Sequence, residues 1–413
     1  MIVSTLNNLL LRQAIHWKLA SERLLKVEDL ASPNAWYGID NTIANTLISS
    51  FRASINQVLS QANSLISSIE KGEVKDLHKQ IIRLKNNYIR TEQTIHYYSF
   101  ALNSRVNPKV ASLLRACDLL CKKSMDELLR PLGKQSPYVL TFLDKGVGAS
   151  ILKAGLRLWD GNVSPVAAIK ITQHNLFRPT SIIHETGHQV AHILGWVEEV
   201  KIVINEELKN VGRHVVRIYS SWSSEMVADA FAFAHTGYAS VSALHDVISG
   251  SKDSVFNFNE FDPHPISYIR LLINTAMCSI SYGSGPWDEL EFIFKELYDL
   301  KTSTNVNKGI IESCSQHVVK IANILLKHKF ACFGNNSLSA IINPIRVSPT
   351  ELHRMELIGG SAIWTSHSWL TREPIRLLSL NGLKIATSTN DPSKLYQLQE
   401  NWMTKLGFTA ELN

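Results

Sequence analysis

The sequence predicts a mainly α-helical protein that also contains a small β-sheet. Apolar residues recur at three- and four-residue steps through most of the first third of the chain. β-Branched and aromatic residues then gather in two short runs, 138–142 and 166–171. Helical patterns return from Thr180 onwards, so we expect helices to dominate and the sheet to stay small.

The length and composition indicate a folded protein of several domains. A chain of 413 residues and 46.3 kDa is too long for one ordinary core. Hydrophobic residues make up 45% and charged residues 19%, which excludes an intrinsically disordered chain. We expect a helical N-terminal domain over 1–135, a domain that holds the sheet over 136–301, and a helical and mixed region over 302–413.

The charge pattern argues against a nucleic-acid partner. The formal net charge is +6, and no block of five or more like charges occurs. No apolar run approaches the ~18 residues that a membrane helix needs. We therefore expect neither nucleic acid nor a membrane span.

The expected compartment is the cytoplasm. The stretch Met1–Leu11 has no basic flank before its apolar residues and soon meets Arg12, unlike a signal peptide. The five cysteines are an odd number and widely spread, which favours a reducing compartment over a disulfide framework. Export by a route that needs no signal peptide stays open.

Two long antiparallel helices are expected in the N-terminal domain. Apolar residues follow helical spacing from Ile43 to Ile69 and again from Val74 to Tyr98, with Gly72 between the two runs. A helical hairpin within the chain is the simpler interpretation. A coiled coil that binds a protein partner through these helices is the alternative.

A further helix is expected to begin at Asn107-Pro108, where a capping residue precedes a first-turn proline, and to stop near 131–133. Cys117 and Cys121 lie one turn apart on it. No second pair of metal ligands stands nearby, so we interpret both as small core residues rather than metal ligands.

Several remaining segments are interpreted as connections. The glycine-containing stretches 146–148 and 283–285 lack the full pattern of a nucleotide-binding loop or a nucleophile elbow, so we expect turns there. The polar stretch 302–309 is expected to be a linker. More helices follow it, and a short mixed segment is expected over 363–413.

One short motif carries metal chemistry: His184-Glu185-Thr186-Gly187-His188. On a helix, residues four apart point the same way, one turn apart along the axis. His184 and His188 can therefore hold one Zn²⁺, and Glu185 is placed to act as a general base. The alternative is a buried amphipathic helix whose two histidines are satisfied within the core.

The flanking residues support a helix around this motif, which we expect to begin near Thr180 and to end at Gly195. Gly187 costs about 1 kcal/mol in a helix interior, so we expect another backbone to approach it closely. His192 is too far along the axis from His184 for both to bind one ion, since eight residues rise ~12 Å. We expect His192 to pack or to support the site.

The third ligand is expected downstream, in Glu225-Met226-Val227-Ala228-Asp229. Ser223 or Ser224 is expected to cap this helix, which is apolar almost all round. Glu225 can complete the zinc ligands, while Asp229 can accept the second ring N–H of a ligand histidine. We expect loss of Asp229 to weaken zinc binding without unfolding the chain.

The combination of His-Glu-x-x-His with Glu-x-x-Ala-Asp resembles the gluzincin metallopeptidases. His264-Pro265 followed by Arg270 is similar to a pattern in the CAAX-prenyl-protease and heat-shock-protease group of these enzymes, whose membrane helices are missing from this chain. The resemblance covers about residues 166–275. It implies a zincin-like catalytic module, to which the helical N-terminal domain is added.

The resemblance also implies roles for single residues. His184, His188 and Glu225 would be ligands to one Zn²⁺ per chain, and Glu185 the general base. Asp229 would orient a ligand histidine. His264 would lie near the oxyanion or hold the C-terminal side of the site, and Arg270 would pair with a carboxylate of the site. The alternative is that His264 only begins a helix and that Arg270 is a surface charge. An edge strand over 166–171 would pair with an extended peptide substrate, which gives Ala168, Ile169 and Lys170 as substrate-binding residues.

These residues together predict a zinc-dependent endopeptidase that acts on a peptide or protein. Tyr219, Tyr268 and His264 are the candidate donors to the oxyanion. One alternative is a helical interaction or regulatory protein that carries an inactive zinc-peptidase module. A second is a zinc hydrolase of non-peptide amides.

Overall fold

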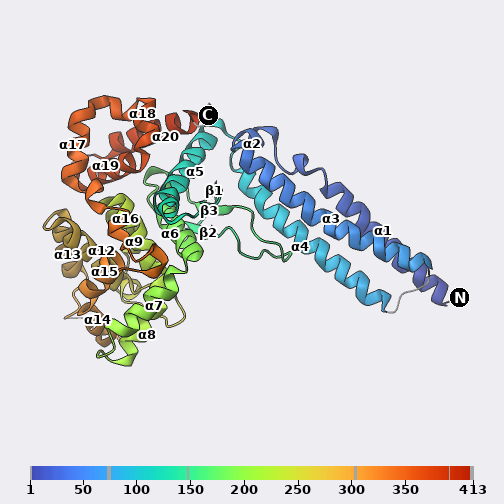
Figure 1. The fold of residues 1–413 in the computed structure, drawn as a ribbon, viewed down its shortest axis with the longest axis horizontal. Helices are drawn as coiled ribbons and strands as arrows, with labels where there is room; N and C mark the ends of the chain where they lie inside the picture. The colour runs from blue at the N-terminus through green and yellow to red at the C-terminus, as the bar shows by residue number, and fades with distance from the viewer. Residues whose placement is uncertain (1, 72–75, 147, 302–304, 390, 410–413) are drawn as a thin grey trace. The chain divides into compact units, whose positions relative to one another are not determined.

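The computed structural model describes residues 2–71, 76–146, 148–301, 305–389 and 391–409, with side chains from Thr5 onwards. The structure is mainly α-helical and contains one three-stranded sheet, as the sequence predicts (Figure 1). None of the described helices combines the length and the hydropathy that a membrane crossing requires.

The chain forms two compact units. The first contains residues 1–114, 138–142 and 152–168, and the second contains 115–137, 143–151 and 169–413. This division differs from the three expected domains, because the residues after 302 share a unit with most of the segment 136–301. The units are also discontinuous in sequence, which a division by composition along the chain does not detect.

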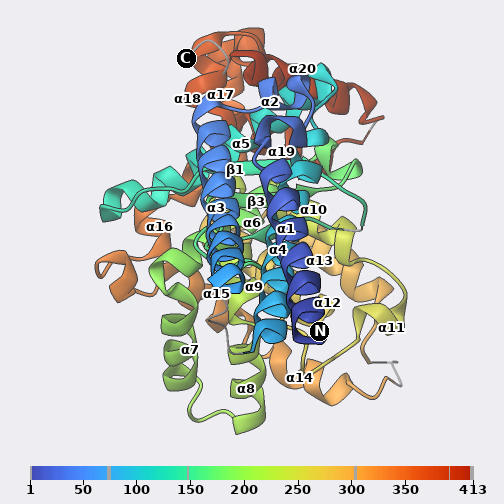
Figure 2. The same ribbon diagram turned by 90° about the vertical axis from the view of Figure 1, so that its right-hand side faces the viewer.

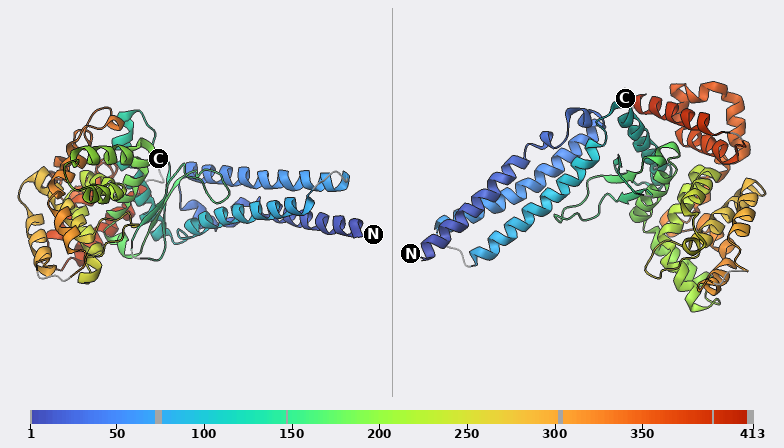
Figure 3. Two further views of the ribbon diagram at one scale, coloured as in Figure 1. Left: turned by 90° about the horizontal axis from the view of Figure 1, so that it is seen from below. Right: turned by 180° about the vertical axis from the view of Figure 1, so that it is seen from behind.

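Three long helices form the main body of the first unit: α1 (Ile2–Leu24), α3 (Asn41–Lys71) and α4 (Leu77–Asn103). They run side by side, with α3 antiparallel to the other two (Figures 1 and 3). The expected hairpin is thus present as α3 and α4, and its expected turn at Gly72 lies outside the described residues. The helix α1, which the sequence analysis did not single out, makes the hairpin a three-helix bundle.

The apolar faces of these helices are buried as their spacing predicts. Leu47, Phe51 and Ile55 of α3 pack with Ile95 and Tyr98 of α4 in one core cluster. A second cluster joins α1 to the C-terminal half of α3 and the N-terminal half of α4. Two short helices, η1 (Val27–Leu30) and α2 (Pro33–Tyr37), connect α1 to α3.

The helix α5 (Pro108–Leu129) begins where the sequence predicts. The side chain of Asn107 accepts hydrogen bonds from the backbone N–H groups of Lys109 and Val110, so it caps the helix. The helix ends in a short 3₁₀ turn, η2 (Arg130–Leu132), followed by Gly133 with φ of +68°. Both of its cysteines are buried free thiols, as expected.

The sheet has the strand order β1–β3–β2, formed by β1 (Val139–Leu143), β3 (Ala167–Ile171) and β2 (Ser150–Leu152). The two β-rich runs are therefore strands, as predicted. The expectation that 166–171 is an edge strand is wrong. Ala168, Ile169 and Lys170 lie in the middle strand, between two neighbours, and the two edges are formed by β1 and the short β2.

Helices make up the rest of the second unit. In chain order they are η3 (His174–Phe177), α6 (Ser181–Leu194), α7 (Trp196–Glu207), α8 (Arg213–Ser221), α9 (Ser223–Thr236), α10 (Tyr238–Ile248), α11 (Lys252–Val255), α12 (Ser267–Tyr282), α13 (Pro286–Leu297), α14 (Lys308–Ser315), α15 (Val318–Lys327), η4 (Ala331–Phe333), α16 (Leu338–Ile341), η5 (Pro344–Val347), α17 (Pro349–Gly359), η6 (Gly360–Trp364), α18 (His367–Arg372), α19 (Pro374–Thr387) and α20 (Ser393–Thr409).

The centre of the second unit is α9. It is in contact with α6, α10, α12, α15 and α19, and nearly all of its residues are buried. This explains why its sequence is apolar almost all round. The helices α17 to α20 pack on one another (Figures 1 and 2).

Two expectations for the C-terminal region are corrected or left open. The segment 363–413 was expected to be mixed, but its described residues form the helices η6, α18, α19 and α20, because their apolar residues face α9, α10 and each other. The expected linker 302–309 lies partly outside the described residues, and α14 begins within it at Lys308.

Candidate metal centre

The two histidines of the motif lie on one face of α6, as the four-residue spacing predicts. The ring centroids of His184 and His188 are 4.8 Å apart. The helix begins at Ser181 and ends at Gly195, whose φ of +70° allows the chain to leave the helix. His192 is exposed in the last turn, outside this group, so it neither packs in the core nor supports the site.

A close approach of α9 brings the third candidate ligand to this face. A Cβ atom on Gly187 would lie 2.8 Å from Cα of Ala228, so only glycine allows the two backbones to come this near. Glu225, three residues before Ala228, then reaches both imidazoles. Gly187 thus marks the close backbone approach that the sequence predicts.

The carboxylate of Glu225 lies between the two rings. Its Oε2 is 3.3 Å from Nε2 of His184, and its Oε1 is 3.3 Å from Nε2 of His188. One ligand atom from each of these three residues lies within 4.8 Å of the others, and His188 and Glu225 are buried. The geometry therefore gathers two imidazole nitrogens and one carboxylate oxygen at one point.

The other nitrogen of each ring has its own partner. Nδ1 of His184 lies 2.8 Å from Oδ1 of Asp229, and Nδ1 of His188 lies 3.3 Å from Oγ of Ser224. These contacts fix how the rings are turned and direct both Nε2 atoms toward Glu225. The pattern is typical of histidines that bind a metal, whose second nitrogen is usually held in this way.

The role of Ser224 differs from the expected helix cap. The chain continues from α8 into α9 through Trp222, with φ of −84° and ψ of −3°, so α9 has no side-chain cap. Ser223 hydrogen-bonds back to the carbonyl of Tyr219 instead. Ser224 is thereby free to contact His188.

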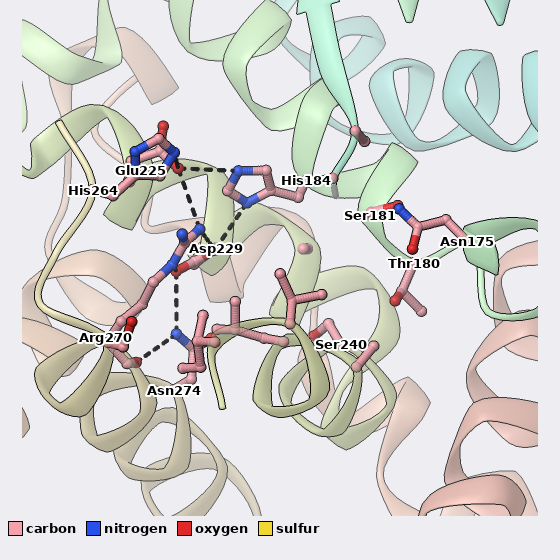
Figure 4. Close-up of a pocket in the computed structure, with 18 of the residues that line it drawn as sticks. Asn175, Thr180, Ser181, His184, Glu225, Asp229, Ser240, His264, Arg270 and Asn274 are labelled. Atoms are coloured by element: carbon pink, nitrogen blue, oxygen red, sulfur yellow. Dashed lines mark hydrogen bonds and ion pairs between the residues drawn. The ribbon is translucent and has the colours of Figure 1, made fainter. Parts of the chain in front are cut away.

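Arg270 of α12 holds the two carboxylates of α9. Its guanidinium donates to both oxygens of Asp229, at 2.7 and 2.8 Å, and to Oε2 of Glu225 at 3.2 Å. Arg270 is thus buried beside the carboxylates with which the resemblance suggested it would pair. Asn274, one turn further along α12, donates to Oδ2 of Asp229 at 3.2 Å (Figure 4).

The buried charges perturb one another strongly. Burial alone would lower the pKa of His184, but hydrogen bonds to Asp229 and Glu225 raise it to about 10. Burial would raise the pKa of Glu225, but the two imidazoles and the Arg270 guanidinium hold it well below its usual range. The pKa of Asp229 is held down in the same way, by Arg270 and His184 against the effect of burial. The site thus favours a positive charge between these carboxylates.

The charge balance matches a divalent cation. The carboxylates of Glu185, Glu225 and Asp229 line one cavity together with the guanidinium of Arg270. With His184 protonated, as its raised pKa favours, these groups leave one uncompensated negative charge in a buried place. With both histidines neutral, as metal ligands must be, they leave two, which is costly without a cation. Two imidazoles and a carboxylate are also a donor set that Zn²⁺ takes in catalytic sites, so the residues present fit this ion.

Glu185 stands apart from these contacts. It is buried and lines the same cavity, of about 400 Å³. Among the described residues, no hydrogen bond or ion pair engages its carboxyl group. The carboxylate is therefore available to a molecule inside the cavity.

His264 also lies at this cavity. Its Nε2 is 3.5 Å from Oε2 of Glu225, and its Nδ1 is 2.6 Å from Oδ1 of Asp262. The ring is more than half exposed and sits at the rim (Figure 4). Asp262, two residues earlier, holds the ring and was not singled out from the sequence.

The two tyrosines proposed as oxyanion donors lie elsewhere. The hydroxyl of Tyr219 donates to the carbonyl of Cys314 at 2.7 Å, in the core. The ring of Tyr268 packs against Phe256 and Phe294 and borders a different cavity. Of the three candidates, only His264 lines the cavity of the metal centre.

Gly148 and Ala149, which directly precede the edge strand β2, line the cavity as well. From the sequence, 146–148 is expected to be a turn and carries no sign of a link to the site; Val147 lies outside the described residues. The middle strand β3, with Ala168, Ile169 and Lys170, contributes no residue to the lining.

Comparison of the chain with protein-family models, with curated proteins and with solved structures finds no match in any of the three. Any proposal about function therefore rests on the residues of this candidate site and their geometry.

Proposed function

We propose that this protein is a zinc-dependent peptidase, and that His184, His188 and Glu225 hold the ion. The second unit would then contain a zincin-like catalytic module built on α6 and α9. One observation carries the proposal: both Nε2 atoms face the carboxylate of Glu225, while both Nδ1 atoms are held by Asp229 and Ser224. In metal sites, one nitrogen of each ligand histidine binds the ion while the other is held by a hydrogen bond, and this arrangement has the same form.

When bound, Zn²⁺ would act as a Lewis acid that polarises a substrate carbonyl and makes water more acidic. The remaining chemistry belongs to side chains of the chain itself. Glu185 is the general base: its unengaged carboxylate takes the proton of the attacking water and passes it to the departing amine. This role needs a carboxylate that lies inside the cavity and does not bind the ion. Glu185 meets both conditions in this proposal.

Two further residues support the reaction. His264, held by Asp262 at the rim, is placed to donate a hydrogen bond from Nε2 to the oxygen of the attacked carbonyl. The edge strand β2, with Gly148 and Ala149 before it, is the segment against which an extended substrate backbone would lie. It replaces the middle strand in the role that the resemblance assigned to 166–171.

The test is a comparison of wild type with Glu185→Gln. We expect wild type to bind one zinc per chain and to cleave an unstructured protein substrate. Glu185→Gln is expected to retain zinc and to lose turnover, by about 100-fold or more, because a general base contributes a factor of 10²–10⁴.

Other outcomes separate the alternatives. A zinc-loaded wild type that cleaves no peptide but hydrolyses small amides would point to a non-peptide hydrolase. If Glu185→Gln left the cellular phenotype intact, catalysis would not be the purpose of the protein, and an interaction role would replace the proposal.

A further inference from the structure

Three polar side-chain atoms in the cavity of the metal centre are buried without a hydrogen-bond partner among the described residues. They are Nδ2 of Asn175, Nε of Arg178 and Oγ of Ser181. All three residues line the same cavity as His184 and Glu185. Buried polar atoms are nearly always paired in native proteins, so three in one place indicate that a partner enters from outside the chain.

The three residues come from one short stretch of sequence. Asn175 lies in η3, Arg178 follows it, and Ser181 is the first residue of α6. Because Ser181, His184 and His188 are spaced three and four residues apart, Ser181 lies on the same helix face as the two histidines, about one turn from His184. Figure 4 shows Asn175, Thr180 and Ser181 grouped on the side of the cavity away from His264 and Arg270.

The group offers donors and positive potential. An amide N–H, a guanidinium N–H and a hydroxyl can all donate, and a guanidinium cannot accept. The guanidinium of Arg178 is held in place, since Nη1 pairs with Asp246 and Nη2 donates to Ser242 at 3.0 Å, which leaves Nε for a ligand. Thr180, at the start of α6, makes no side-chain cap, so the helix N-terminus adds partial positive charge.

The burial of these atoms makes the donors selective. All three donor atoms are buried, and Asn175 as a whole is only 8% exposed. An acceptor that reaches them is removed from water and must take its hydrogen bonds from this group. A carboxylate, with two oxygens and a negative charge, uses all three donors and the helix terminus together.

Part of the cavity lining is apolar. Ala243, Leu244 and Ile248 of α10 contribute to it, beside the polar Ser240 of the same helix. A ligand that spans the cavity therefore presents aliphatic surface beside its carboxylate.

We propose that this end of the cavity binds a carboxylate of the substrate, through Asn175, Arg178 and Ser181. The inference rests on the proposed function, because it makes the carboxylate part of the molecule that is cleaved at the neighbouring metal centre. The carboxylate comes either from the C-terminus of a peptide or from an acidic side chain near the cleaved bond. The first source would make the protein act at chain ends, and the second would make it an endopeptidase that cuts beside acidic residues.

The experiment measures binding rather than turnover, on the full-length chain in zinc-free and zinc-loaded forms. The probes are short N-terminally fluorescent peptides, read by fluorescence anisotropy. One pair ends in leucine as the free acid or as the amide. The other pair is amidated at the C-terminus and carries Glu or Gln at the residue before it. In the zinc-loaded form, Glu185→Gln prevents cleavage during the measurement.

We expect the carboxylate member of one pair to bind about 10-fold or more tightly than its neutral partner, as hydrogen bonds to charged groups typically give. The pair that shows the preference identifies the source of the carboxylate. The preference should be strongest in the zinc-loaded protein, where the ion compensates the carboxylates of the cavity. It should persist more weakly in the zinc-free protein, since none of the three donors is a metal ligand. Equal binding within both pairs would overturn the inference.

Substitutions assign the preference to this group. Asn175→Asp has almost the same shape but adds a negative charge, so it should abolish the preference while the neutral peptides still bind. Ser181→Ala removes a single hydroxyl and should reduce the preference about tenfold, the lower end of what one hydrogen bond to a charged group contributes. Gln173→Ala, an exposed position of the same segment outside the cavity, is the matched control and should change nothing.

The outcomes separate this inference from the proposed function. A carboxylate preference in a protein that neither binds zinc nor cleaves peptides would leave the carboxylate site standing and reject the peptidase. Zinc binding and cleavage without any carboxylate preference would do the reverse. A preference that persists in both Asn175→Asp and Ser181→Ala would contradict the assignment of the site to these residues.

Discussion

The backbones of α6 and α9 meet at Gly187 and Ala228. A Cβ atom added at Gly187 would lie 2.8 Å from Cα and 3.1 Å from the carbonyl oxygen of Ala228. Both neighbouring atoms belong to the backbone, so neither can turn aside as a side chain would. This contact sets how closely Glu225 approaches the two histidines.

The first prediction is that Gly187→Ala weakens zinc binding by moving α9. The shift separates Glu225 from His184 and His188, and we expect zinc affinity to fall about 10- to 100-fold, as when a contact that positions a ligand is lost. Crowding should also destabilise the fold by about 1–3 kcal/mol, partly offset by the better helix propensity of alanine. Chelator competition and denaturant unfolding measure the two effects.

Gly309→Ala is the control for that substitution. Gly309 lies inside α14, and an added Cβ there would meet no atom within 4 Å. It should gain up to about 1 kcal/mol of stability from helix propensity and leave zinc affinity unchanged. Unchanged zinc affinity in Gly187→Ala itself would mean that the close approach does not position Glu225.

The second prediction concerns Asp229, which contacts His184, Arg270 and Asn274 at once. Asp229→Ala would leave the buried Arg270 without its main partner, a loss that typically costs about 3–5 kcal/mol. The structure thus revises our expectation from the sequence that this change spares the fold. Asp229→Asn also removes the negative charge, but it keeps the size of the side chain and one acceptor oxygen for Arg270. We therefore expect a smaller loss of stability, together with zinc affinity that is lower by about 10- to 100-fold.

These two substitutions are compared by thermal unfolding and by chelator competition at one pH, because protons compete with the metal for its ligands. Asn274→Ala removes a donor to Asp229 and to the carbonyl of Arg270 but leaves both charges of the Asp229–Arg270 pair in place, so it serves as the milder comparison. If Asp229→Asn bound zinc like wild type, the orientation of His184 would not depend on this carboxylate.

The third prediction is that Ser224 contributes less to zinc affinity than Asp229 does. Its hydroxyl holds Nδ1 of His188 at 3.3 Å, a longer contact that carries no charge. Ser224→Ala should therefore weaken zinc binding by less than Asp229→Asn, about 3- to 10-fold, with little effect on unfolding. A larger loss than that of Asp229→Asn would reverse the assignment of which histidine is held more firmly.

The sequence predicts the parts of the centre that lie within one helix. His184 and His188 share a face of α6, and Glu225 and Asp229 share a face of α9, because the helical period alone decides it. That the two helices meet could only be suggested, through Gly187 and the carboxylates of an otherwise apolar helix. The actual contact depends on packing between segments about 40 residues apart in the chain.

Features that depend on neighbours distant in the sequence were missed or mistaken. Whether β3 lies at an edge depends on β2, whose three residues are too few to show alternation. Ser224 does not cap α9, because the chain passes from α8 into α9 through Trp222 in a helical conformation. Asn175 and Ser181 look like ordinary loop and helix-start residues, and only their burial without partners marks them.

The fourth prediction concerns pH and lies away from the metal centre. Burial would raise the pKa of Glu127, but His235, Arg346 and Lys123 outweigh it and hold the pKa below its ordinary value. A carboxyl group with a lowered pKa stabilises the fold above its unfolded pKa, and this contribution is lost as the pH falls through the folded pKa. Glu127→Gln should therefore be less stable than wild type at pH 7, and the difference should shrink below about pH 4.5.

Urea unfolding at several pH values measures this difference. The matched control is Glu312→Gln, at an exposed position of α14, which should follow wild type throughout. A difference between Glu127→Gln and wild type that stayed constant down to pH 3 would show that the ion pairs of Glu127 do not stabilise the fold.

The most direct test of the central claim is the zinc affinity of Glu225→Ala against wild type, by chelator competition at one pH. Wild type should bind one zinc per chain. Glu225→Ala should lose more affinity than Asp229→Asn, because it removes a ligand and one of the charges that neutralise the ion. Glu185→Gln should retain zinc, since Glu185 is not a ligand. If Glu225→Ala bound zinc as tightly as wild type, then His184, His188 and Glu225 would not form a metal centre, and the proposed zinc peptidase would be rejected.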